Sequence, residues 1–263
     1  MMAFTVKIAN APICIQCRDA SLREKYASYL TDDAPACTVS VSDEELDAAW
    51  QAHSFRYMVD YRTGERLSDD VMNDPRFTAE LDAIRKHCRR ADEEDMIYRK
   101  IAYLLPRYGA FVLHGCAVGL DGRGYVFSGR SGVGKSTHVS LWLERFPEAK
   151  IINGDKPILM KQNGQWLVCG SPWQGKENLG CVMQLPLKGI CHLTRGETNT
   201  IAPTKKVSDW LFSSVLLPEE EEDSKRLFSL LSEMTASVPL YRMTVNNFAP
   251  DAVTVSHQGL TQE

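Results

Sequence analysis

The sequence predicts an α/β protein with a mixed sheet, built around a strand, a glycine-rich turn and a helix near the middle of the chain. Residues 124–128 form a short apolar run typical of a buried strand, and residues 137–146 carry apolar side chains at helical spacing. Residues 110–120 form a strong β run that ends in a tight turn, and residues 150–155 form another that ends in an acid. Strands joined both by helices and by tight turns indicate a mixed sheet.

The glycine-rich turn has the spacing of a phosphate-binding loop. Gly129, Gly134, Lys135 and Ser136 fit the pattern G-x-x-x-x-G-K-[ST]. Glycines let the backbone turn tightly enough for N–H groups to face phosphate oxygens, and the following helix adds its N-terminal dipole. We expect Lys135 to reach the β- and γ-phosphates and the Ser136 hydroxyl to bind Mg²⁺. The predicted ATP-binding residues are Gly129, Arg130, Ser131, Gly132, Val133, Gly134, Lys135, Ser136 and Thr137.

The composition indicates an ordinary globular protein. The chain has 263 residues, 44% of them hydrophobic and 24% charged, which is enough for one large domain or two small ones. The net charge of −4 gives no reason to expect nucleic acid or an anionic membrane as a partner. We see neither a membrane-spanning run nor an export signal, so we expect a cytoplasmic protein whose eight cysteines are reduced. Homo-oligomerisation stays open.

The first third of the chain predicts a mixed α+β region without a motif that carries chemistry. Ser42 and Glu45 form a capping-box pattern at the start of a helix. The nucleotide-binding pattern begins only after Pro106 and Gly109 end a helical stretch, so we divide the chain into residues 1–104 and 105–263. The expected strands are 4–16 (broken at Pro12), 37–41 and 55–61, and the expected helices are 21–30, 43–50, 77–89 and 93–105.

Beyond the loop, the strand at 150–155 ends in Asp155, whose carboxylate can face the Mg²⁺ bound to Ser136. The strand that carries His114 is expected to lie antiparallel to the strand before the loop, because only a tight turn separates them. Residues 170–180 form a polar loop with several glycines. The remaining expected elements are a hairpin at Asn163-Gly164, a strand at 187–193, helices at 205–216 and 223–236, and edge strands at 238–243 and 253–255.

These features together resemble one known family. The order Leu113-His114-Gly115, hairpin, phosphate loop and Asn153-Gly154-Asp155 is similar to the catalytic domain of HPr kinase/phosphorylase and its smaller relatives. That resemblance covers about residues 105–200 and implies a phosphoenolpyruvate carboxykinase-like core. The sequence patterns on either side of it predict an N-terminal α+β region and C-terminal helices. The resemblance also implies that His114 faces the phosphate site and that Asp155 binds metal or accepts the proton of the acceptor hydroxyl.

The chain departs from the family pattern at two positions. The family commonly has two adjacent acids where this chain has Asp155 followed by Lys156, and an acid where this chain has Thr137. These differences argue against a true HPr-directed kinase and favour a relative that acts on another hydroxyl.

Two functions from different classes remain open. The first is an ATP-dependent kinase acting on a hydroxyl of a small metabolite (amino acid, polyol or sugar) or of a protein serine, with Lys135, Asp155 and His114 as catalytic residues. The second is a nucleotide-binding regulatory or accessory module, for instance in peptide modification, with little or no turnover. Mg²⁺ is the expected cofactor, held by Ser136 and Asp155. The candidate acceptor-binding residues are Trp173, Lys176, Glu177 and Arg195.

Overall fold

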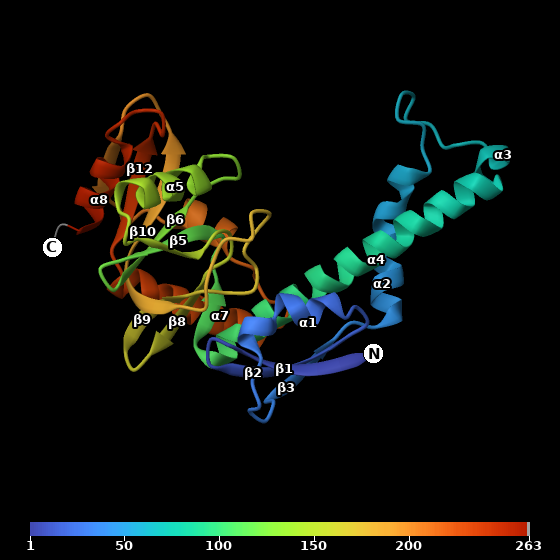
Figure 1. Cartoon of the computed structure of the whole chain (residues 1–263), viewed down its shortest axis with the longest axis horizontal. Helices are drawn as coiled ribbons and strands as arrows, with labels where there is room; N and C mark the ends of the chain where they lie inside the picture. Colours follow the sequence, from blue (N-terminus) through green and yellow to red (C-terminus); the bar gives the residue numbers. More distant parts are fainter. Residues whose placement is uncertain (262–263) are drawn as a thin grey trace. The chain divides into compact units, whose positions relative to one another are not determined.

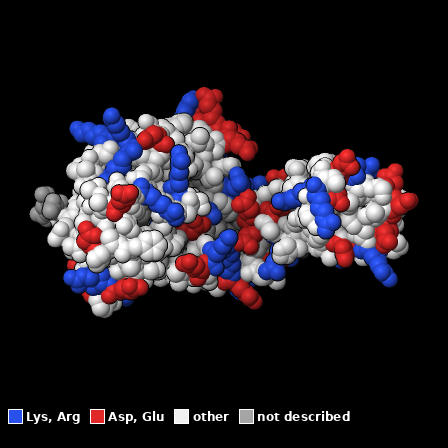
Figure 2. All heavy atoms as spheres, turned by 90° about the horizontal axis from the view of Figure 1, so that it is seen from above, with Lys and Arg blue, Asp and Glu red and all other residues white. Residues whose placement is uncertain are grey.

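A computed structural model describes residues 1–261, which form two compact units (Figure 1). Residues 1–6 and 12–100 make up the first unit, and the second consists of residues 7–11 and, as far as the chain is described, 101–261. No helix of the described residues is long and apolar enough to cross a membrane. On the face shown in Figure 2, Lys and Arg side chains are interspersed with Asp and Glu.

The first unit contains a three-stranded sheet and a set of helices. The sheet has the order β1-β2-β3, and β3 runs parallel to β2. The predicted capping box is present, because Ser42 accepts from the Glu45 backbone N–H and Glu45 accepts from that of Ser42. The elements are β1 (Met2–Ile8), β2 (Ala11–Cys17), α1 (Ser21–Lys25), η1 (Ala27–Tyr29), β3 (Cys37–Ser40), α2 (Asp43–Ser54), η2 (Phe55–Tyr57), α3 (Asp69–Met72) and α4 (Pro75–Leu104).

The second unit is built on a curled mixed sheet of nine strands. Its main path is β4-β8-β9-β10-β6-β5-β7, and β12 lies between β10 and the short β11. The elements are η3 (Leu105–Tyr108), β4 (Ala110–Val112), β5 (Gly115–Leu120), β6 (Arg123–Ser128), α5 (Lys135–Arg145), β7 (Lys150–Asn153), β8 (Ile158–Gln162), β9 (Gln165–Cys169), β10 (Gln184–Arg195), β11 (Thr200–Pro203), α6 (Ser208–Leu211), η4 (Phe212–Ser214), α7 (Glu221–Ser237), β12 (Leu240–Val245) and α8 (Ala252–Thr261).

The central strands bury both of their faces, which explains why they read as continuous apolar runs. In β6, Val126 belongs to a core that includes side chains of α6 and α7, whereas Tyr125 and Phe127 belong to a second core with side chains of α5 and α8. This alternation follows from the two-residue period of a strand. Helices therefore cover the sheet on both faces, and the glycine-rich loop after β6 is fixed between two packed layers.

Several sequence predictions are confirmed in this unit. The strand that carries the glycine-rich loop, β6, is antiparallel to β5 as expected, and β8 and β9 form the hairpin at Asn163-Gly164. The helix predicted at 223–236 is present as α7, and Glu221, Glu222 and Asp223 in its first turn suit its dipole. A mixed α/β protein with a curled mixed sheet and flanking helices is thus what the chain forms.

Other predictions are wrong. Residues 55–61 form η2 and an isolated bridge at Val59 instead of a strand. The two helices predicted at 77–89 and 93–105 form the single helix α4, because neither glycine nor proline separates them. Residues 205–216 form only the short α6 and η4.

The C-terminal edge strands also need correction. Residues 253–255 lie in helix α8, where Val253, Ser256 and Leu260 face the interior at helical spacing. The sequence pattern predicts a strand here because Val253 and Val255 are β-branched, and such residues are enriched in strands. The strand predicted at 238–243 exists as β12, but it is an interior strand because β10 and β11 pair with its two sides.

Candidate functional site

The candidate site lies in the second unit, at the end of the sheet where three parallel strands have their carboxyl ends. Strand β10 is parallel to both β6 and β12. Their carboxyl ends lead to the glycine-rich loop at 129–134, to Arg195 and to Asn246. Loops at this end of an α/β sheet commonly hold ligands, since the strands position them rigidly while their tips stay accessible.

Glycine is required in the loop because the backbone adopts conformations that other residues avoid. The φ angles of Gly129, Gly132 and Gly134 are 147°, 76° and 104°. Gly134 caps the N-terminus of α5, so the unpaired N–H groups of that helix face the loop. The ammonium group of Lys135 folds back over the loop and donates to the carbonyls of Gly129 at 3.0 Å and Arg130 at 3.4 Å. A cation and several N–H donors are therefore gathered for an anion.

His114 and Asp155 lie side by side at the same end of the sheet. The β run predicted at 110–120 breaks at Leu113-His114, so His114 occupies the bend between β4 and β5 rather than a strand. His114 Nε2 lies 3.5 Å from Asp155 Oδ1. Burial lowers the pKa of His114 below its ordinary value of 6.5, and the nearby Lys135 lowers it further, more than Asp155 raises it. His114 is therefore neutral near pH 7 and can accept a proton.

Two buried polar residues hold the turn that carries Asp155. The side-chain oxygen of Asn153 accepts from the backbone N–H groups of Asp155 at 2.9 Å and Lys156 at 2.6 Å. The Asn153 amide in turn donates to Ser171 Oγ at 2.9 Å, and Ser171 Oγ donates to the Lys156 carbonyl at 2.6 Å. Both Asn153 and Ser171 are completely buried. This network fixes the position of Asp155 without using its carboxylate.

The donor set around Asp155 fits a magnesium ion that arrives with a nucleotide. Cys116 Sγ donates to the Gly154 carbonyl at 2.9 Å and lies 3.8 Å from Ser136 Oγ, so the Ser136 hydroxyl is close to the segment that carries Asp155. Mg²⁺ commonly takes one or two carboxylates and completes its shell with phosphate oxygens and water. Within residues 1–261 no cluster of three or more His, Cys, Asp and Glu side chains forms a metal cage. The Lys156 ammonium group lies 3.0 Å from Asp155 Oδ2 and would compete with such an ion.

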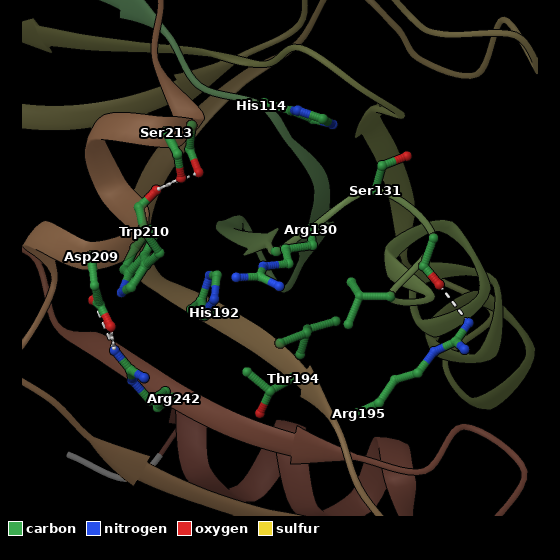
Figure 3. Close-up of a pocket in the computed structure, with 15 residues that line it drawn as sticks. His114, Arg130, Ser131, His192, Thr194, Arg195, Asp209, Trp210, Ser213 and Arg242 are labelled. Atoms are coloured by element: carbon green, nitrogen blue, oxygen red, sulfur yellow. Dashed lines mark hydrogen bonds and ion pairs between the residues drawn. The ribbon is translucent and has the colours of Figure 1, made fainter.

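A cavity of about 880 Å³ opens in front of the loop (Figure 3). Residues of the loop form one wall, His114 lies on its rim, and the ends of β10 and β12 form the opposite wall with α6 and η4. Its size lies in the range of small-molecule sites. The lining residues are His114, Gly129, Arg130, Ser131, Gly132, Val133, His192, Leu193, Thr194, Arg195, Asp209, Trp210, Ser213, Ser214 and Arg242.

The wall opposite the loop pairs two aromatic rings with an ion pair. The rings of His192 and Trp210 stack with centroids 4.8 Å apart, and Arg242 binds the Asp209 carboxylate at 2.6 Å. Burial is the main cause that lowers the pKa of His192, and Arg242 lowers it further. His192 Nδ1 and Trp210 Nε1 are buried without a hydrogen-bond partner among the described residues, which is uncommon in native proteins. This wall therefore holds two buried polar atoms whose hydrogen-bonding capacity is unused in the part of the chain that the structure describes.

The residues predicted to bind an acceptor are dispersed. Arg195 lines the cavity and donates to the Gly132 carbonyl at 2.5 Å. Trp173 is only 4% exposed, and its loop is held by Ser171. Lys176 and Glu177 are exposed and do not line the cavity in front of the loop. Their loop comes close to Asp155 at Gly175, where an added Cβ would lie 3.0 Å from Asp155 Cβ.

Sequence reasoning missed several residues of the site. Asn153 stands in the motif before Asp155 without a predicted role, although asparagine side chains often bond to the backbone two residues on, in an Asx turn. His192 had a weaker one, as a polar residue near the carboxyl end of a predicted strand. Trp210 and Arg242 had no signal, because distant segments bring them close to the loop: Arg242 through the pairing of β12 with β10, and Trp210 through its stacking on His192.

Comparisons with known proteins add a similarity in fold. No protein-family model matches the sequence, and no curated protein matches it. Among solved structures, the HPr(Ser) kinase/phosphatase from Coxiella burnetii matches with 14% sequence identity over 46% of this chain and 86% of that chain, with a TM-score of 0.28. At this level the similarity concerns the course of the chain over less than half of the protein and supplies no evidence for an activity.

Proposed function

We propose that this protein is an ATP-dependent kinase that transfers the γ-phosphate of Mg-ATP to a hydroxyl group, on a small metabolite or on a serine of a small protein. One observation carries the proposal. His114, on the rim of the cavity in front of the loop, lies 3.5 Å from Asp155. A group that can accept a proton would therefore lie close to the substrate hydroxyl that attacks a loop-bound phosphate.

The residues present suit phosphoryl transfer, which needs positioning and charge neutralisation more than covalent help. Backbone N–H groups of the loop and Lys135 would hold the phosphates. Ser136 and Asp155 would hold Mg²⁺, which neutralises charge on the transferred group. As the acceptor oxygen bonds to the γ-phosphorus, its proton passes to Asp155 or His114, and the bond from the γ-phosphorus to the bridging oxygen breaks to release ADP.

The acceptor would occupy the wall opposite the loop. This assignment follows from the cavity, which is much wider than a terminal phosphate needs and continues to His192, Trp210 and Arg242. The three arginines of the lining, Arg130, Arg195 and Arg242, suit anionic groups, although Arg242 is already paired with Asp209.

The test is ADP formation from Mg-ATP with a panel of amino acids, polyols, sugars and small serine-bearing proteins, with Lys135→Ala as the control. We expect turnover with one acceptor class and its loss in the variant. ATP binding without phosphorylation of any acceptor would reject the kinase proposal.

The second candidate is a nucleotide-binding accessory module with little or no turnover. The ion pair of Lys156 and Asp155 favours it. An ammonium group 3.0 Å from the carboxylate weakens the attraction of that carboxylate for a metal ion or a proton. Nucleotide binding that changes the affinity for a protein partner, without ADP release, would support this candidate over the kinase.

A further inference from the structure

A second cavity, of about 490 Å³, adjoins the glycine-rich loop on another side. It shares Val133 and Arg195 with the first cavity, so the two meet at the loop. The second cavity lies against the first turn of α5 and extends to the segment that follows β12. Its lining residues are Val133, Gly134, Thr137, Arg195, Gly196, Glu197, Val245, Asn246, Asn247 and Phe248.

We propose that this second cavity holds the base and ribose of the nucleotide whose phosphates the loop binds. The inference rests on the proposed function and names the other end of the same ligand. In a phosphate loop the lysine reaches the β- and γ-phosphates, while the backbone cradles the α- and β-phosphates. With the terminal phosphate near Asp155, the nucleoside leaves the loop away from His114, and Gly134 and Thr137 line the cavity found there.

Phe248 supplies the aromatic surface that a base needs. Its side chain is 98% exposed although it borders the cavity, which is far more than apolar packing would leave. Nucleic bases stack on such rings whatever their hydrogen-bonding pattern, because every base has a π face. Beside this polar cavity, the uncovered ring of Phe248 offers a face on which a flat ligand can stack.

Two asparagine amides next to Phe248 are available for polar contacts. Asn246 donates to the Glu197 carbonyl at 3.1 Å and accepts from the Phe248 N–H at 3.1 Å. Asn247 donates to the Gly134 carbonyl at 3.0 Å. Each amide group carries two hydrogens, and the bonds to the Glu197 and Gly134 carbonyls use one hydrogen each. Donors of this kind suit the acceptor atoms of a base and the ribose hydroxyls.

The Asn247 side chain is held in place from behind. His138 Nδ1 lies 2.8 Å from Asn247 Oδ1, and His138 Nε2 lies 2.9 Å from Ser256 Oγ. His138 and Ser256 are completely buried. The amide of Asn247 is therefore already held in position for a polar contact with a ligand. The ring of Phe248 beside it is uncovered and free to stack.

The experiment compares binding of Mg-ATP and Mg-tripolyphosphate by calorimetry in the wild type, Phe248→Ala and Phe248→Trp. Tripolyphosphate offers the phosphates alone, so it isolates the loop from the base site. We expect wild type to prefer ATP by tenfold or more, and Phe248→Ala to weaken ATP binding by about tenfold with tripolyphosphate unchanged, in line with base stacking. Phe248→Trp should retain the affinity for ATP.

The matched control is Phe228→Ala, which removes an exposed phenylalanine from α7 in the same unit. It should change neither affinity. Equal binding of ATP and tripolyphosphate in wild type, or unchanged ATP binding in Phe248→Ala, would overturn the base site while leaving the loop intact. If neither compound binds to wild type, both the base site and the proposed kinase fail together.

Discussion

The ammonium group of Lys156 lies 3.0 Å from the carboxylate of Asp155, its neighbour in the chain. Both side chains are about one third exposed or less. The lysine stands where the resembled kinase family commonly has a second acid, so one charge of the expected pair is reversed. The buried Asn153 nevertheless holds the turn by accepting from its backbone N–H groups, and the buried Ser171 by donating to its Lys156 carbonyl. The carboxylate of Asp155 thus remains available, with a cation and a neutral histidine beside it.

Replacing this carboxylate tests its role directly. We expect Asp155→Asn to lower the rate of ADP formation at least ~100-fold, because binding a metal and accepting a proton both need the charge. The shape of the side chain is kept, so the unfolding free energy should change little. Steady-state kinetics with saturating Mg-ATP measures the effect. A variant with nearly normal rates would show that the metal and the base lie elsewhere.

Removing the lysine should strengthen magnesium binding. In Lys156→Ala the carboxylate no longer shares its charge with an ammonium group, and partly exposed ion pairs of this kind are worth about 0.2–1 kcal/mol, or up to about fivefold in affinity. The Mg²⁺ concentration for half-maximal nucleotide binding should fall by that factor. Lys161→Ala, which breaks the ion pair of Lys161 and Glu233, is the matched control and should leave it unchanged. A higher magnesium requirement in Lys156→Ala would mean that the lysine assists the site.

The hydrogen bonds of His138 form a directed chain. The Trp142 indole donates to Ser256 Oγ at 2.9 Å, and because Asn247 uses its NH₂ group for Gly134, its oxygen must accept from His138 Nδ1–H. Burial lowers the pKa of His138, which keeps the ring neutral with Nε2 as an acceptor.

Breaking this chain should destabilise the second unit. His138→Phe keeps a flat ring but leaves the Asn247 oxygen and the Ser256 hydroxyl without their partner, which costs about 1–3 kcal/mol of unfolding free energy. Urea unfolding measures it. Ser140→Ala, at an exposed position of the same helix, should change stability by less than ~0.5 kcal/mol. Equal effects of the two substitutions would contradict the role of the chain.

Stability should fall as the pH is lowered through the range in which histidine titrates. The pKa values of His114, His138 and His192 all lie below the ordinary 6.5, in each case mainly through burial. Between that value and the lowered native pKa values, the unfolded chain binds protons that the native protein does not, so the unfolding free energy decreases with decreasing pH. Urea titrations at about pH 7.5 and pH 5.5 test this.

The matched variant for the pH series is His192→Asn. It removes one of the three groups, so the loss of stability on acidification should become smaller. An unfolding free energy that is independent of pH in this range would show that these histidines are protonated in the native protein, contrary to the effect expected of burial.

Local chemistry accounts for the parts of the fold that the sequence predicted well. The glycines before Lys135 permit the positive φ angles of the loop, and Asn163-Gly164 favours the tight turn of a hairpin. Ser42 and Glu45 together cap the start of a helix. Prediction failed where tertiary packing outweighs local preference. The β-branched run at 253–255 became part of α8, since Val253, Ser256 and Leu260 then face the core together.

The sequence by itself determined the glycine-rich loop, the helix that follows it, the antiparallel strand beside it and the acid at Asp155, because each depends on residues near one another in the chain. Only the tertiary structure decided that His114 lies in a bend beside Asp155, that Trp210 and Arg242 line the cavity, and that Phe248 borders a second one. His114 and Asp155 meet because β5 lies between β6 and β7, and Arg242 reaches the cavity through the parallel pairing of β12 with β10. Such pairing joins segments far apart in sequence, so no local pattern records it.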